Sequence, residues 1–176
     1  FDTIDTAHVG FAWTSNMPVF ITPFSMDAIE WEYTTSARIL ENGEFIERDP
    51  FDCKIDYSYR SIGKQPTQYA HHNEPLTFYS FLKDKGVKNI ARFASYPPHS
   101  HEAIVTLLKL VLLNRKHLEN NGITKPLDFT TEVLRRLPVP NGYEERECLW
   151  LMLFGHKKDK DKTIEMDCVA GTLPGW

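Results

Sequence analysis

VKNIARFASYPPHSHEAIVTLLKLVLLN, residues 87–114, predicts a buried strand, a short loop and a buried helix. Its first part mixes β-branched and aromatic residues, as strands do, and Pro97 and Pro98 stop that strand from continuing. The helix that follows is predicted to have Ser100 as its N-cap. Its apolar face repeats at helical spacing through Ile104, Leu107, Leu108, Val111 and Leu112.

Arg92 lies within the predicted strand, between Ala91 and Phe93. A charge at such a position is rarely buried unless it is paired or binds an anion. A guanidinium held on a rigid strand can grip a carboxylate through two hydrogen bonds, which suits an amino-acid-type substrate. An internal ion pair with Glu74 or Glu102 satisfies the same requirement. The chemistry of these residues alone leaves both possibilities open.

Size and composition indicate one globular domain of ordinary size. The chain has 176 residues, of which 41% are hydrophobic and 25% charged, and this balance excludes a disordered chain. A formal net charge of -4 and an isoelectric point near 6.0 argue against a nucleic-acid partner, because phosphate binding needs clustered Lys and Arg.

No apolar run is long enough to span a membrane, since the longest, residues 107–113, contains Lys109. The cysteines, Cys53, Cys148 and Cys168, are far apart and lack the spacing of a disulfide framework or a zinc site. We therefore expect them to be reduced and buried in a soluble, cytoplasmic protein without a membrane partner. The start at Phe1, with no Met and no signal-peptide pattern, predicts a fragment of a longer protein.

The first half of the chain predicts two strands, a helix and a hairpin. Residues 3–14 alternate enough for a strand, and 19–21 are predicted to be extended. Ser25 is the expected cap of a short helix that carries Met26, Ile29, Trp31 and Tyr33. Asn42 and Gly43 then supply the two positive φ values that a tight hairpin turn requires.

The second half predicts a further strand, two helices and a hairpin. Residues 55–59 alternate as a half-exposed strand does, and YAHHNE at 69–74 is predicted to open a helix that Asn73 caps and Gly86 ends. A short helix is expected over 127–137, and residues 148–154 and 163–169 form a hairpin with a charged tip. The predicted fold class is α+β, with a mostly antiparallel or mixed sheet and helices packed on one face.

Four histidines suggest a metal site, as in a metal-dependent hydrolase. They are His71, His72, His99 and His101, and they would have to converge with a carboxylate such as Glu74 or Glu102. Polar loops and helix caps also explain them, and this is the interpretation that we favour. The chain contains no dinucleotide-binding G-x-G-x-x-G motif and no G-x-S-x-G nucleophile motif, so we assign no cofactor, metal or catalytic residue to it.

The order of four stretches resembles the substrate-binding and dimerising domain of the saccharopine dehydrogenase-like oxidoreductases. The stretches are PFSMDAIEWEYTTSARILENGEFIE (23–47), GKQPTQYAHHNEPLTF (63–78), NIARFASYP (89–97) and LFGHKKDKDKTIEMD (153–167). The resemblance implies a two-domain enzyme in which an N-terminal Rossmann domain of the same chain holds NAD or NADP. The 1–176 segment would then be a single α+β domain that binds substrate and forms a homodimer, with no cofactor site of its own.

The resemblance also implies roles for three residues. Arg92 matches the family's arginine that grips a substrate carboxylate, and His72 and Glu74 match its "hpE" positions at a helix start. Such enzymes form or oxidise a secondary amine by hydride transfer. Residues 10–18, GFAWTSNMP, replace the family's frequent GGLP segment, so the substrate is not defined. A carboxynorspermidine dehydrogenase-like domain is the alternative within the enzyme class, and a non-catalytic binding or assembly module is the alternative outside it.

Overall fold

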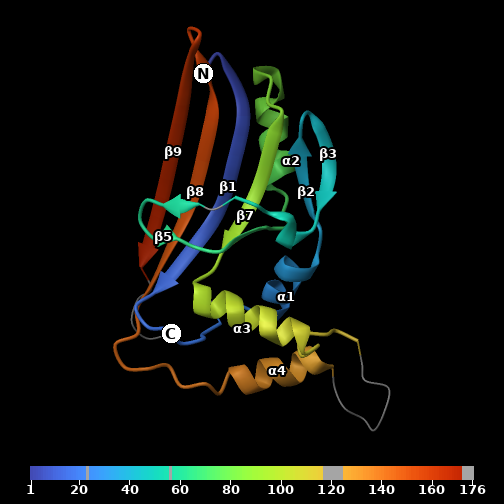
Figure 1. Ribbon diagram of the computed structural model, residues 1–176, viewed down its shortest axis with the longest axis vertical. Helices are drawn as coiled ribbons and strands as arrows, with labels where there is room; N and C mark the ends of the chain where they lie inside the picture. Colours follow the sequence, from blue (N-terminus) through green and yellow to red (C-terminus); the bar gives the residue numbers. More distant parts are fainter. Residues whose placement is uncertain (23, 56, 117–124, 172–176) are drawn as a thin grey trace.

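The computed structural model describes residues 1–22, 24–55, 57–116 and 125–171. A seven-stranded sheet forms the body of the molecule, with strand order β3-β2-β7-β1-β8-β9 and β6 paired to β7 (Figure 1). Its strands are β1 (Thr3–Ser15), β2 (Ala37–Glu41), β3 (Glu44–Arg48), β6 (Thr67–Tyr69), β7 (Asn89–Ser95), β8 (Glu145–Lys157) and β9 (Lys160–Gly171). A separate two-stranded sheet joins β4 (Ser58–Tyr59) to β5 (Gly63–Lys64).

The sheet is mixed because β7 and β1 run parallel while the other pairs are antiparallel. Strand β7 pairs with β1 along one edge. Along its other edge, Ile90 pairs with β2 and residues 93–95 pair with β6. This position explains why residues 89–95 are buried almost throughout, since a central strand is covered on both faces.

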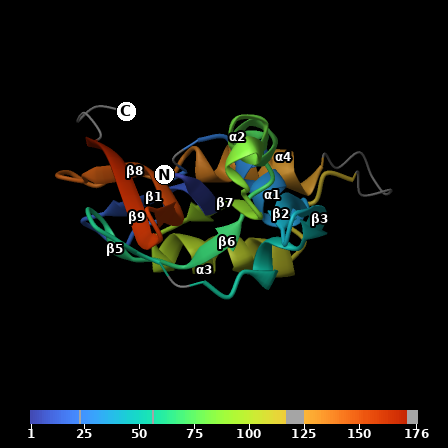
Figure 2. The ribbon, with the colours of Figure 1, turned by 90° about the horizontal axis from the view of Figure 1, so that it is seen from above.

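Among the described residues, four α-helices accompany the sheet: α1 (Met26–Thr34), α2 (Glu74–Leu82), α3 (Pro98–Lys109) and α4 (Pro126–Leu134). Helix α2 lies along the sheet, whereas α1, α3 and α4 gather beyond one end of it (Figure 1). Seen from above, α2 and the segment that carries β5 and β6 lie on opposite sides of the molecule (Figure 2). The predicted α+β class with a mixed sheet is therefore confirmed.

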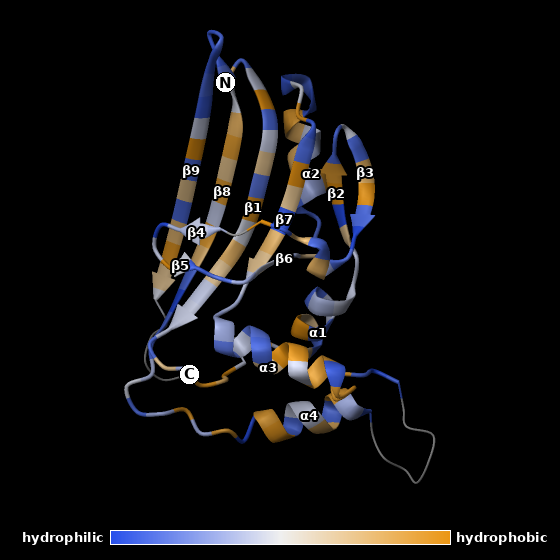
Figure 3. Cartoon of the chain, in the orientation of Figure 1, coloured by the Kyte–Doolittle hydropathy of each residue, from blue (hydrophilic) through white to orange (hydrophobic). Residues whose placement is uncertain are grey.

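The two faces of β7 enter different parts of the core. Ala91 and Phe93 pack with Trp150 and the tyrosines of the β4 region, whereas Ile90 packs toward α2 and Ala94 toward α1 and α3. The alternation of hydropathy along the strands is visible in Figure 3. Because side chains alternate along a strand, Arg92 projects from the same face as Ile90 and Ala94.

Helix α3 exists where the sequence predicts it, but both predicted ends are wrong. It begins at Pro98, since proline fits the first turn of a helix, and Ser100 lies inside it with its hydroxyl buried. It ends at Lys109, and Val111 adopts a left-handed φ of 63°. That reversal brings Leu113 into the core at 2% exposure, while Val111 stays 53% exposed.

Both predicted hairpins are confirmed. Asn42 and Gly43 have φ values of 52° and 87°, and the β8–β9 hairpin turns through Lys158 and Asp159 with φ values of 51° and 57°. Paired positive values of this size fit the tight turn whose twist matches that of the strands. The β8 and β9 strands are longer than the apolar residues alone predict.

Several local predictions are wrong. Residues 19–21 form no strand, and residues 67–69 form β6 before helix α2 begins at Glu74. Of the predicted strand over 55–59, residue 56 lies outside the described residues and β4 covers Ser58–Tyr59. Helix α4 ends at Leu134 instead of residue 137. Cys148 is buried as expected, but Cys168 is exposed on the edge strand β9. The structure of these segments depends on contacts with residues far away in the sequence, and sequence periodicity gives no information about such contacts.

Candidate functional site

Arg92 is held on β7 with only 8% of its surface exposed. Its Nη1 donates to the carbonyl oxygen of Phe93 at 2.9 Å, and its guanidinium carbon lies 5.2 Å from the ring centroid of Phe11. A hydrogen bond from a charged donor and a cation–π contact both stabilise a buried guanidinium. Neighbours on β7 and β1 therefore hold the Arg92 side chain in place.

Glu74 and His72 meet Arg92 at the start of helix α2. Arg92 Nε donates to Glu74 Oε1 at 3.4 Å, and the other oxygen of Glu74 bonds His72 Nδ1. Asn73 is the N-cap residue as predicted, although its side chain makes no capping bond, and Glu74 occupies the first turn. A carboxylate is favoured there by the helix dipole. The three residues named from the sequence thus form one chain of contacts.

The sequence offers Glu74 and Glu102 as ion-pair partners of Arg92, and in the structure Arg92 pairs with Glu74. Among the described residues, no ion pair joins Arg92 to Glu102. The Glu74 side chain is 31% exposed and the separation is long for a charged hydrogen bond, so this pair is weak. An arginine carries five N–H donors, and within the described ranges no partner is found for Nη2 of Arg92. The guanidinium therefore keeps capacity for a further acceptor.

Sequence reasoning missed Glu32 and Tyr96, which lie beside this cluster. Tyr96 donates from its hydroxyl to Glu32 Oε2 at 2.9 Å, and Glu32 is only 8% exposed. Burial raises the pKa of the Glu32 carboxyl, and Arg92 partly offsets that rise. A signal was present in the sequence: Glu32 comes three residues after Ile29 and therefore falls on the buried face of α1.

Gln68 is a second missed neighbour. It pairs with Ala94 across β6 and β7, which places it on the Arg92 face of the sheet. The residue is 2% exposed, and neither its amide oxygen nor its nitrogen has a partner among the described residues. Gln68 and Arg92 are diagonal neighbours on adjacent strands, a relation that long side chains can bridge. No periodicity in the sequence reveals this pairing.

The histidines do not converge. His71 Nδ1 bonds the carbonyl oxygen of Ser36 at 2.7 Å, whereas His101 Nδ1 bonds the hydroxyl of Tyr33 at 3.1 Å, and burial lowers the pKa of His101. Within the described ranges, no group of three or more His, Cys, Asp and Glu side chains is placed to hold a metal ion. The arrangement therefore lacks the ligand set that the metal interpretation requires.

The fold and the cluster together define an α+β domain on a mixed sheet with an arginine held on its central strand. This fold is saccharopine dehydrogenase-like. The structure is similar to that of apo histidine-tagged saccharopine dehydrogenase (L-Glu forming) from Saccharomyces cerevisiae, with a TM-score of 0.71 and 9% sequence identity. The similarity covers 96% of this chain and 53% of that one, so the chain spans about half the length of this solved structure.

The sequence itself matches no family model and no curated protein. At 9% identity the structural similarity establishes the fold alone. The expected saccharopine dehydrogenase-like fold is therefore confirmed, while substrate, cofactor and dimer remain predictions. No helix among the described residues is long and apolar enough to cross a membrane.

Proposed function

We propose that this chain is the substrate-binding domain of an NAD(P)-dependent, saccharopine dehydrogenase-like oxidoreductase acting on a carboxylate-bearing secondary amine or imine. The observation that carries the proposal is the state of Arg92. The residue is 8% exposed, its ion pair with Glu74 is weak, and its Nη2 has no partner among the described residues. A substrate carboxylate is the acceptor that best matches this geometry.

Glu74 and His72 complete the proposed site. In the free protein Glu74 neutralises part of the Arg92 charge, and on binding the substrate carboxylate takes its place at the guanidinium. The Glu74 carboxylate then remains beside the substrate amine, and His72 hydrogen-bonds its second oxygen. Hydride transfer would take place on NAD or NADP held by a Rossmann domain of the same protein, which supplies the redox chemistry.

Kinetics of the full-length enzyme test the role of Arg92. We expect Arg92→Ala to raise KM for the substrate far more than it changes the affinity for NAD(P), and Arg92→Lys to recover only part of the loss because lysine lacks the planar fork. Arg136→Ala is the matched control, since Arg136 is exposed and pairs with Glu132 on α4. An unchanged KM in Arg92→Ala would mean that Arg92 is structural.

Two further observations test the domain assignment, and the second of them separates the enzyme from a non-catalytic binding module. We expect the 176-residue chain alone to show no NAD(P) binding by calorimetry, and measurable binding would contradict the domain assignment. We also expect a G-x-G-x-x-G strand and helix in the sequence that precedes Phe1 in the full-length protein. If that segment is missing there, the binding module is the better assignment.

A further inference from the structure

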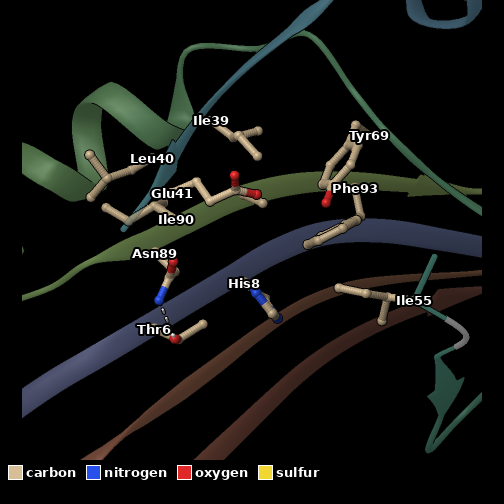
Figure 4. A pocket seen from close by; sticks show the side chains of 11 residues that line it. Thr6, His8, Ile39, Leu40, Glu41, Ile55, Tyr69, Asn89, Ile90 and Phe93 are labelled. Carbon is tan, nitrogen blue, oxygen red and sulfur yellow. Dashed lines mark hydrogen bonds between the residues drawn. The ribbon is translucent and has the colours of Figure 1, made fainter. Parts of the chain in front are cut away.

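A pocket of about 230 Å³ opens on the face of the sheet opposite Arg92 (Figure 4). Its walls come from β1, β2, β6, β7 and the segment before β4, through side chains that include His8, Glu41, Ile55, Tyr69, Asn89 and Phe93. Figure 4 shows Tyr69, Phe93 and Ile55 toward one end and Thr6 and Asn89 toward the other. The cluster around Arg92 contributes no side chain to this lining.

The apolar end of the pocket is a rigid aromatic wall. The rings of Tyr69 and Phe93 stack with centroids 5.3 Å apart, and His8 meets Phe93 edge to face at 5.2 Å. Ile39 and Ile55 complete this end. Such a wall fits a flat or short apolar group, as small-molecule sites commonly do.

The imidazole of His8 is neutral at physiological pH. Burial lowers the pKa of His8 to about 4, and its Nδ1 is hydrogen-bonded to the Tyr57 hydroxyl. Burial raises the pKa of Tyr57, so that hydroxyl keeps its proton and can donate it to Nδ1. Nε2 then carries the imidazole proton. His8 therefore adds a neutral donor and no positive charge to the pocket.

The negative charge in the pocket lining comes from Glu41. Glu41 is the one carboxylate among the lining residues, and Arg48 Nη2 is bonded to only one of its oxygens, Oε2. Burial raises the pKa of the Tyr69 hydroxyl, and Cys53, Glu41 and Asp52 raise it further, whereas Arg48 lowers it. Within the part of the chain that the structure describes, Glu41 Oε1 has no hydrogen-bond partner, so it is the acceptor available to a bound cation.

We propose that this pocket is a binding site for a small primary ammonium compound, with its cation at Glu41 and its apolar body against Phe93 and Tyr69. The site is distinct from the one around Arg92 and does not depend on the proposed enzymatic function. A volume of about 230 Å³ corresponds to roughly eight liquid-water volumes, which limits the ligand to a molecule such as an arylalkylamine.

Two ligands of the same shape test the charge requirement without altering the protein. 2-Phenylethylamine and 2-phenylethanol are titrated by calorimetry, and binding is mapped by NMR on the side chains of His8 and Tyr69. We expect the amine to bind roughly tenfold more tightly than the alcohol, because only the amine makes a charge-assisted bond to Glu41. We expect the shifts to centre on the pocket and to leave Arg92 unaffected.

A pair of variants tests the contact itself. Glu41→Gln should abolish the preference for the amine, whereas Glu44→Gln, at the other end of the same hairpin turn and outside the pocket lining, should retain it. The proposal is overturned if the two ligands bind equally well, if neither binds saturably below about 10 mM, or if the amine shifts the resonances of Arg92 and Glu74 instead. A failure here leaves the assignment of Arg92 untouched, since the two sites lie on opposite faces.

Discussion

Replacing Arg92 by methionine should destabilise the fold, mainly through the backbone contact and only slightly through the ion pair. Methionine keeps the apolar stem and removes the guanidinium. The buried carbonyl of Phe93 then loses a charged donor at 2.9 Å, which costs about 1.5–3 kcal/mol. Loss of the contact with the Phe11 ring adds about 0.5–1 kcal/mol. We expect a total loss of about 2–4 kcal/mol.

The Glu74 side of the pair should contribute much less. At 3.4 Å and 31% side-chain exposure, solvent screening limits this interaction to about 0.5–1 kcal/mol. Glu74→Gln is therefore expected to cost less than about 1 kcal/mol, and the coupling energy from a double-mutant cycle with Arg92→Met should be equally small. A weak internal pair is also what the proposed exchange of Glu74 for a substrate carboxylate requires.

Urea denaturation of the wild type, the two single variants and the double variant measures all four free energies. The m-values should agree among the four proteins, so that the differences report stability alone. A coupling energy above about 2 kcal/mol would refute the reasoning. It would show that Arg92 and Glu74 form a tight structural pair with no capacity to exchange for a ligand.

Three further predictions concern the fold. Gly10→Ala should cost about 1–3 kcal/mol in thermal denaturation, because a Cβ there would lie 2.4 Å from the carbonyl oxygen of Phe93, while Gly171→Ala, with 4.0 Å to its nearest neighbour, should be nearly neutral. Gly43→Ala should cost about 1 kcal/mol from its φ of 87° alone, since no atom lies within 4 Å, and an unchanged midpoint would mean that the turn relaxes. Burial raises the pKa of the Glu32 carboxyl above its ordinary 4.5, so the folded state binds that proton more tightly than the unfolded state does. The stability that this provides at acidic pH is lost as the pH rises through the raised pKa. In Glu32→Gln the free energy of unfolding should therefore depend less on pH over that range. An identical pH profile in the variant would contradict the Glu32 assignment.

Local sequence determined the parts of this protein that depend on neighbours along the chain. The Asn42-Gly43 turn and the break at Pro97-Pro98 follow from backbone sterics, which act over a few residues and are encoded in residue type. The β8–β9 hairpin follows from two apolar stretches on either side of a charged segment. The apolar character of 87–96 likewise marked a buried strand, and Arg92 was conspicuous because a charge in such a strand needs a partner.

Tertiary structure decided which groups meet. Nothing in the sequence shows that β1 runs parallel to β7, because apolar periodicity reports that a strand is buried and not which strand lies beside it. Gln68 joins the Arg92 face only through the register of β6 on β7, and Glu32 joins it from a helix beyond the end of the sheet. The pocket at His8 is likewise built from five separate segments. The sequence alone therefore identified Arg92 as a candidate. Its pairing with Glu74 follows from long-range packing, because only the folded backbone sets distances between residues far apart in the chain.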